Sequence, residues 1–323
     1  MHETSLSFGP NQDLIGTVTM PATTALGPCM PFGMVLFNAG VVTRIGPHRI
    51  NVKLARELAR RGTPSIRFDL HAMGDSQIAG GTQTYREQVV SDLQAAMNAL
   101  HDASGVHQFA LLGFCSGALP ACWAAQRDAR VCHIILYDAF ELQTVKSQIR
   151  FLAARLRSLG LRPAAFLWRL RGAARAALTF LRSRLSKLFD RTEAGHPVPS
   201  DDSPTRRQLA ELFGQLMQKR IKVTVLHSGS DFSNVNYAKQ IAEAVNAGGV
   251  SATGLRTGLL ASIDHVATST RAQREFIEFI CADLFNDVGG ARAWPHLPQG
   301  QLGAASCSQV RTHELPAAQS SDV

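Results

Sequence analysis

The segment Gly113-Phe114-Cys115-Ser116-Gly117 has the residue types that nucleophilic catalysis needs. It lies between an apolar run that predicts a strand and an alanine-rich run that predicts a helix. A sharp turn between the two strains its central residue and leaves no room for side chains at the flanking positions, which glycine satisfies. The helix N-terminus would favour the reactive thiolate. We therefore predict that Cys115 is a nucleophile; Ser116 is a rival, and a structural cysteine in a turn is the alternative.

Two side chains farther along the chain could activate this thiol. Asp231 follows a later predicted strand, and His265 lies between the last predicted strand and the final helix. In a triad, the imidazole accepts the thiol proton, while the carboxylate fixes the imidazole tautomer and stabilises its positive charge. We predict a triad of Cys115, His265 and Asp231. Asp138, which follows the preceding strand, and Asp264 stay open as alternative acids.

A covalent mechanism through Cys115 also needs backbone N–H groups that bind the developing oxyanion. One donor is expected from Ser116, directly after the nucleophile, and another from the loop after Phe37, at Gly40 or Val41. This site calls for no cofactor. The chain has no HExxH motif or Cys/His ligand cluster, so we predict no metal site.

Predicted strands and helices alternate along the chain, and several strands are short apolar runs typical of buried parallel strands. This alternation predicts an α/β fold with a mostly parallel central sheet and helices on both faces. The predicted strands cover residues 5–9 and 14–20 (a hairpin), 34–37, 65–70, 109–112, 131–137, 221–226 and 253–257, and the predicted helices cover residues 51–61, 85–100, 118–126, 236–246 and 270–285.

Several short motifs along residues 5–285 resemble those of the α/β-hydrolase superfamily, and in particular the bacterial hydrolases associated with exosortase and exopolysaccharide loci. This resemblance implies an α/β-hydrolase fold and a triad formed by the elbow residue, a late acid and a late histidine, here Cys115, Asp231 and His265. A cysteine at the elbow is also similar to dienelactone hydrolases and polyhydroxyalkanoate synthases. The motifs are Phe8-Gly9-Pro10, Asn38-Ala39-Gly40, Arg44-Ile45-Gly46-Pro47-His48-Arg49, Arg67-Phe68-Asp69-Leu70, Gly74-Asp75-Ser76, Gly113-Phe114-Cys115-Ser116-Gly117 and Asp264-His265.

Positive charge is concentrated in one segment. Residues 141–190 carry eleven basic and two acidic residues, so this segment accounts for the net charge of +8. Leucines spaced by three or four along 167–188 predict an amphipathic helix. We predict a basic helical lid over 141–219, inserted into a hydrolase core formed by 1–140 and 220–286. Its apolar stripe would line an acyl pocket, or the lid would dock an acyl carrier or an anionic membrane surface.

Composition limits the remaining possibilities. The first thirty residues lack the pattern of a signal peptide, and no run of about 20 apolar residues predicts a membrane span. Scattered cysteines favour a reducing cytoplasm, with peripheral attachment to the inner membrane as an option. The core is nearly neutral, so we do not expect a nucleic-acid partner. The Gly-, Pro- and Ser-rich residues 287–323 predict a disordered tail.

Together these patterns predict a hydrolase that cleaves an ester or a thioester through an acyl-cysteine intermediate. The substrate would be a small molecule or a carrier-bound acyl group. An acyltransferase with the same triad is the enzymatic alternative, because an acyl-thiol can pass to water or to another nucleophile. A non-catalytic binding protein on the same fold is the alternative from another class.

Overall fold

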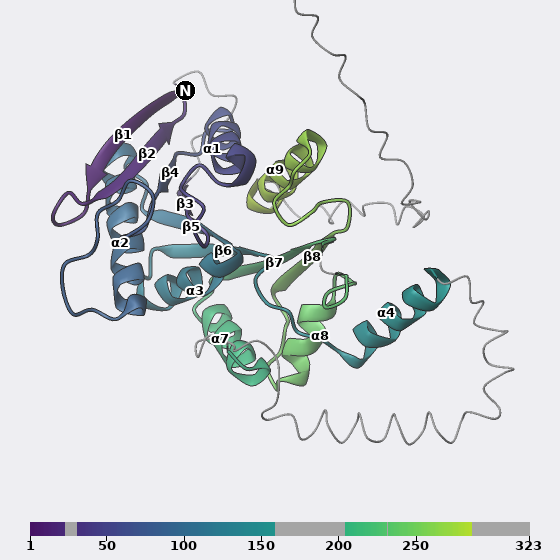
Figure 1. The fold of residues 1–323 in the computed structure, drawn as a ribbon. Helices are drawn as coiled ribbons and strands as arrows, with labels where there is room; N and C mark the ends of the chain where they lie inside the picture. The colour runs from purple at the N-terminus through teal and green to yellow at the C-terminus, as the bar shows by residue number, and fades with distance from the viewer. Residues whose placement is uncertain (23–30, 159–203, 231, 286–323) are drawn as a thin grey trace, which may run out of the picture.

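The computed structural model describes residues 1–22, 31–158, 204–230 and 232–285 (Figure 1). Its centre is an eight-stranded sheet in the order β1-β2-β4-β3-β5-β6-β7-β8. Only β2 runs against its neighbours, since it pairs antiparallel with both β1 and β4 while the remaining pairs are parallel. The strands are β1 (His2–Phe8), β2 (Leu14–Met20), β3 (Phe32–Phe37), β4 (Ser65–Phe68), β5 (Gln108–Phe114), β6 (Val131–Tyr137), β7 (Lys222–Ser228) and β8 (Leu255–Leu260).

Helices cover both faces of the sheet, as the alternation of elements predicts (Figure 1). One face packs against α1 (Ile50–Arg60) and α9 (Thr270–Phe285). The other face packs against the helices α2 (Tyr85–Ser104), α3 (Ala118–Arg127), α7 (Arg206–Gln218) and α8 (Gln240–Ala247). The predicted α/β fold with a mostly parallel sheet and the predicted N-terminal hairpin are confirmed.

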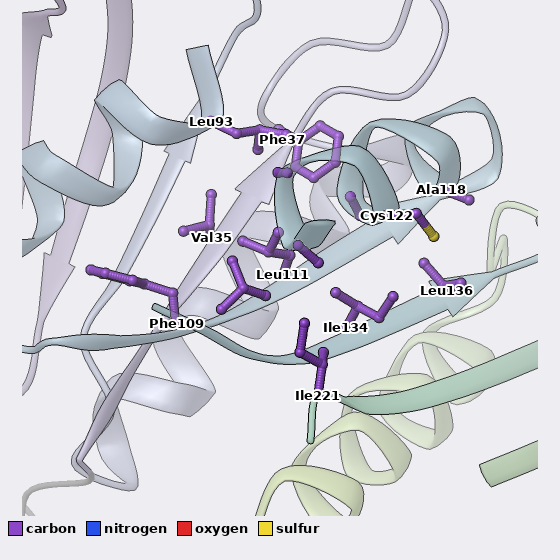
Figure 2. Packing of buried hydrophobic residues seen from close by; sticks show 14 of the residues in the cluster. Val35, Phe37, Leu93, Phe109, Leu111, Ala118, Cys122, Ile134, Leu136 and Ile221 are labelled. Atoms are coloured by element: carbon purple, nitrogen blue, oxygen red, sulfur yellow. The ribbon is translucent and has the colours of Figure 1, made fainter. Parts of the chain in front are cut away.

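Each central strand supplies both apolar layers, because successive side chains of a strand point to opposite faces of the sheet. On β3, Val35 and Phe37 lie in the layer under α2 and α3, whereas Met34 and Leu36 lie in the layer under α1 and α9. Figure 2 shows part of the first layer, where Leu93 of α2 lies near Phe37 of β3 and side chains of β5 and β6 continue the same cluster. Burial on both faces explains why these strands are continuous apolar runs.

The predicted insertion divides into two described helices with different surroundings. Helix α4 (Val145–Ser158) follows β6 and extends away from the sheet (Figure 1). Helix α7 begins at a Thr205–Gln208 capping box and belongs to the core, because its side chains Leu209, Phe213 and Leu216 are fully buried. The leucine stripe predicted over 167–188 and the predicted tail lie outside the described residues, so the lid stays a prediction.

No helix within the described ranges is long and apolar enough to cross a membrane.

Candidate active site

Cys115 occupies the apex of a tight turn between β5 and α3. Strand β5 ends at Phe114, a single 3-10 turn spans Cys115–Gly117, and α3 starts directly afterwards. The backbone φ of Cys115 is 50°, a left-handed conformation that non-glycine residues rarely adopt. A Cβ atom on Gly113 would lie 2.8 Å from the Cα atom of Ala118 and 2.8 Å from the carbonyl oxygen of Gly117. The glycine at this position is therefore required by close backbone packing, as the motif predicts.

Cys115 differs from the other described cysteines in its surroundings. Its side chain is only partly buried, whereas Cys122 and Cys281 are fully buried. Cys132 is also partly buried, but its thiol donates to the carbonyl of Phe109 at 3.4 Å. Burial raises the pKa of the Cys281 thiol to about 12 and raises the pKa values of the Cys122 and Cys132 thiols as well. These three thiols stay protonated at neutral pH and serve as small apolar groups. Cys115 is therefore the described cysteine best situated to react.

His265 approaches this turn from the loop between β8 and α9. Its ring centroid lies 5.4 Å from that of Phe114, the residue before Cys115, and 6.5 Å from that of Tyr137, on which the ring stacks. Nδ1 of His265 is 2.8 Å from Oδ2 of Asp138. A carboxylate at Nδ1 accepts the N–H of a neutral ring, so Nε2 is left with the lone pair that can accept a proton. The imidazole thus lies beside the elbow with Nδ1 turned toward a carboxylate.

Asp138 is held firmly at the end of β6. Its backbone φ is 47°, and its N–H donates to the carbonyl of Leu226 on β7. Its Oδ1 atom accepts the N–H of Ser228 at 2.6 Å, while Oδ2 faces the imidazole. The His265 backbone N–H donates in turn to the hydroxyl of Ser230 at 2.6 Å. Carboxylate and histidine are therefore fixed to the same strand end, that of β7.

Among the described residues, the acid that contacts His265 is the sequence alternative Asp138. The preferred Asp231 lies outside the described residues and stays a prediction. Both acids follow strands that end at the same edge of the sheet, and β6 and β7 are neighbours. Sequence spacing alone does not tell which carboxylate reaches the ring. Asp264 caps the following turn, since its carboxylate accepts the N–H and the hydroxyl of Thr268.

Tyr137 supports the histidine from beneath. Its side chain is fully buried, and its hydroxyl donates to the carbonyl of Asp264 at 3.2 Å. Burial, and with it the negative charge of Asp138, raises the pKa of this phenol, so it remains a protonated donor. The ring of Phe276 on α9 packs edge-on against Tyr137 with centroids 4.9 Å apart. Nothing in the chain pattern marked Tyr137 as a support for the site, because it ends an ordinary apolar strand.

The residues predicted to bind the oxyanion come together at the elbow. The Gly40 N–H donates to the Ser116 hydroxyl oxygen at 2.7 Å, and Gly40 has a φ of 52°. The side chain of Val41 points into solvent and is 92% exposed. Gly40 and Ser116 thus meet across 76 residues of sequence, but the Gly40 N–H is engaged by a hydroxyl that a substrate oxygen would have to displace.

A buried carboxylate fixes the loop that carries Gly40. The Arg44 N–H donates to Oδ1 of Asp69 at 2.6 Å, and the Arg44 guanidinium pairs with the same carboxylate and, at 2.7 Å, with Asp75. Asn38 accepts the N–H of Leu70 through its side-chain oxygen at 2.9 Å. These contacts tie the end of β3 to the end of β4. Charge-assisted hydrogen bonds of this kind hold a loop in one geometry.

The remaining histidines of interest have structural contacts. His71 lies between Asp92, 2.6 Å from its Nδ1, and Asp13, 3.2 Å from its Nε2. His227 Nε2 is 3.0 Å from the carbonyl oxygen of Phe140. His48 is exposed within the 3-10 turn Pro47–Arg49. Over the part of the chain that the structure describes, no three His, Cys, Asp or Glu side chains cluster as metal ligands would.

A sequence model of the alpha/beta hydrolase fold family matches residues 44–237, which is more than half of the chain. This protein belongs to the α/β-hydrolase family. It is an enzyme of the hydrolase type. A search of curated proteins found no match.

Among solved structures, this α/β hydrolase is similar to an α/β serine hydrolase homologue from Coxiella burnetii, with 15% identity, a TM-score of 0.50, and coverage of 88% of this chain and 97% of the other. An α/β serine hydrolase without a lid from Xanthomonas campestris has 13% identity and a TM-score of 0.49, covering 90% and 96% of the two chains. An esterase from Pyrococcus furiosus has 15% identity and a TM-score of 0.47, covering 89% and 91%. Identities this low reflect a shared fold and do not identify a substrate.

Proposed function

We propose that this α/β hydrolase cleaves an ester or a thioester through an acyl-Cys115 intermediate, with His265 as the general base and Asp138 as its orienting acid. The observation that supports this most directly is the 2.8 Å contact between Asp138 and Nδ1 of a histidine whose ring lies beside the elbow. The partly buried thiol on a left-handed backbone supplies the third group.

In the proposed reaction, Nε2 of His265 accepts the Cys115 thiol proton as the sulfur attacks the carbonyl carbon of the substrate. The negative charge moves to the carbonyl oxygen, where backbone N–H groups of Gly40 and Ser116 would bind it. The tetrahedral intermediate then expels the alcohol or thiol, which takes the proton from His265. Water attacks the acyl-thiol with the same histidine as base, releasing the carboxylic acid and restoring the thiol.

The nucleophile is tested by intact mass spectrometry after exposure to a panel of activated esters and acyl thioesters. We expect the full chain to gain one acyl group and the Cys115→Ala variant to gain none. Cys132→Ala is the matched control, because it removes another thiol that is not an elbow residue, and it should acylate normally. Equal acylation of Cys115→Ala would refute the proposed nucleophile, and no acylation of any form would favour a binding protein on this fold.

Product analysis separates hydrolysis from acyl transfer. Turnover in water with an added alcohol or amine should yield the free carboxylic acid if the protein is a hydrolase. Predominant formation of the new ester or amide would instead assign the acyltransferase alternative. The motif resemblance to hydrolases of exosortase and exopolysaccharide loci remains part of the proposal, and a gene neighbourhood without such a locus would count against it. A carrier-bound acyl substrate is a further part that the thioester panel tests.

A further inference from the structure

Large exposed aliphatic side chains are gathered in segments that leave the carboxyl ends of the parallel strands. Nine large hydrophobic side chains are exposed in the described chain, and only Met1 and Tyr85 lie elsewhere. The loop after β3 exposes Val41, Val42 and Ile45, and the loop after β4 exposes Ile78. The remaining three lie on α4, which follows β6, and they are Val145, Ile149 and Leu152.

The nucleophile lies between these apolar groups. In the sheet, β5 carries Cys115 at its carboxyl end and has β3 and β6 as its two direct neighbours. Adjacent strands are about 4.8 Å apart, so the apolar loop after β3 and the segment leading to α4 leave the sheet on either side of the elbow. Three of these side chains share one helix, α4, and exposed apolar patches on soluble proteins mark interaction sites. The catalytic edge is therefore the edge that presents apolar groups to its surroundings.

Helix α4 turns its apolar stripe away from the protein. Ser147 is its buried side chain, and successive residues of a helix are rotated by about 100°, so Val145, Ile149 and Leu152 lie on the side opposite Ser147. Exposed fractions of 65%, 62% and 58% for these three residues agree with that geometry. Half-buried Leu156 continues the same stripe one turn later.

The charge of α4 complements an anionic surface. The helix carries Lys146, Arg150, Arg155 and Arg157 and no acidic residue. Lys146 lies 4.4 Å from the Tyr237 ring centroid and Arg150 5.7 Å, so these two are on the flank of the helix nearer the body. An outward apolar stripe with cations beside it is the pattern of helices that lie in the headgroup region of a membrane.

We propose that the carboxyl-end face of this protein, formed by the exposed aliphatic residues after β3, β4 and β6, docks on an anionic lipid bilayer with the Cys115 elbow facing the lipid. The aliphatic side chains would enter the acyl boundary, and Arg155 and Arg157 of α4 would contact lipid phosphates. A second copy of this chain is disfavoured as the occupant, because a face-to-face dimer would oppose two α4 helices of the same positive charge. This docking goes beyond the proposed reaction and does not require that Cys115 be a nucleophile.

The test is co-sedimentation of the full chain with vesicles of phosphatidylcholine alone or with phosphatidylglycerol added. We expect at least a 10-fold stronger partition onto the anionic vesicles, weakened by salt. The variant Ile149→Glu/Leu152→Glu should lose at least 10-fold of this partition, and Ile78→Glu should also weaken it. The matched control is His107→Glu/Gln108→Glu, which adds the same charge at exposed residues beside the amino end of β5 and should bind like the parent.

Several results would overturn the proposal. These are no partition of the parent protein, unchanged binding by the α4 variant, or equal loss in the control. A lowered melting temperature of the α4 variant together with no vesicle binding would show that the stripe packs within the chain. Saturable binding to an acidic carrier protein without vesicle partition would assign the face to a protein. Cys115→Ala protein should bind vesicles normally, so failure of the acyl-enzyme proposal and failure of docking are distinguishable.

Discussion

His265 receives its orientation from one carboxylate, and that carboxylate has a second contact that keeps it in place. Asp138 binds the imidazole through Oδ2 and the Ser228 N–H through Oδ1. A left-handed backbone at Asp138 aims the side chain along the edge of the sheet, and aspartate tolerates this conformation better than most residues. The orientation of the His265 ring therefore depends on Asp138.

Replacing Asp138 by Asn should lower kcat by about 100- to 10,000-fold, because the amide neither fixes the Nδ1–H tautomer nor stabilises the imidazolium. Steady-state kinetics on an activated ester or thioester measure this effect. Asp231→Asn and Asp264→Asn serve as controls and should retain activity close to the parent. A loss in Asp231→Asn as large as that in Asp138→Asn would restore Asp231 as the triad acid.

The Ser116 hydroxyl accepts a hydrogen bond from the Gly40 N–H, the donor that a bound oxyanion would need. The Gly40 N–H has one hydrogen to donate, and the Ser116 hydroxyl accepts it at 2.7 Å. Breaking such a bond costs about 0.5–1.5 kcal/mol. Ser116→Ala removes this competitor, so we expect kcat/KM to rise by about 2- to 10-fold in the same kinetic assay. A fall of 10-fold or more would mean that the hydroxyl itself donates to the oxyanion.

At the scale of elements, the turn between β5 and α3 is held by atoms that cannot move aside. The Gly113→Ala methyl would meet the Ala118 Cα and the Gly117 carbonyl, both at 2.8 Å. Overpacking against backbone typically costs about 1–3 kcal/mol, and we expect that loss in the free energy of unfolding measured by denaturant titration. Gly80→Ala is the control, since no atom lies within 4 Å of its added Cβ, and it should change stability by less than about 0.5 kcal/mol.

The loop after β4 is joined to α2 and to the β1–β2 turn by a buried imidazole. Burial lowers the pKa of His71, but its hydrogen bonds and charge interactions with Asp13 and Asp92 outweigh this and raise the pKa above its ordinary value of 6.5. A raised pKa in the folded state means that the stability from protonated His71 is fully present below about pH 6.5. It is lost as pH rises through the folded-state value.

The free energy of unfolding should therefore differ most between the parent and His71→Gln near pH 6, and the difference should shrink toward pH 9. Chemical denaturation at several pH values provides the measurement. His107→Gln is a suitable comparison, because His107 is exposed and should give a difference that is small at every pH. A parent-variant difference that stays constant from pH 6 to pH 9 would contradict the assigned charge of His71.

At the scale of the whole molecule, the alternation of apolar runs was sufficient to predict the sheet and its covering helices. The order of residue types also predicted the turn at Cys115 and the approach of His265 to it. It likewise predicted that Gly40 and Ser116 lie at the same site. The contact between His265 and Asp138 did not follow, because β6 and β7 end at the same edge and the order of residues leaves both Asp138 and Asp231 open. The membership of α7 in the core was likewise hidden, since an apolar helical stripe fits a lid and a core helix equally well.

The apolar layer under α1 and α9 supports both parts of the candidate site. Cys115 packs partly against this layer, Phe114 is buried in it, and His265 precedes α9, which packs in the same layer. From α9, Phe276 touches Tyr137, and Tyr137 stacks on the imidazole. The imidazole is thus supported from the α9 side, through Tyr137 and Phe276. A substitution deep under α9 should slow turnover while the Cys115 thiol remains open to simple alkylating reagents, so the two rates report separately on the imidazole and on the sulfur.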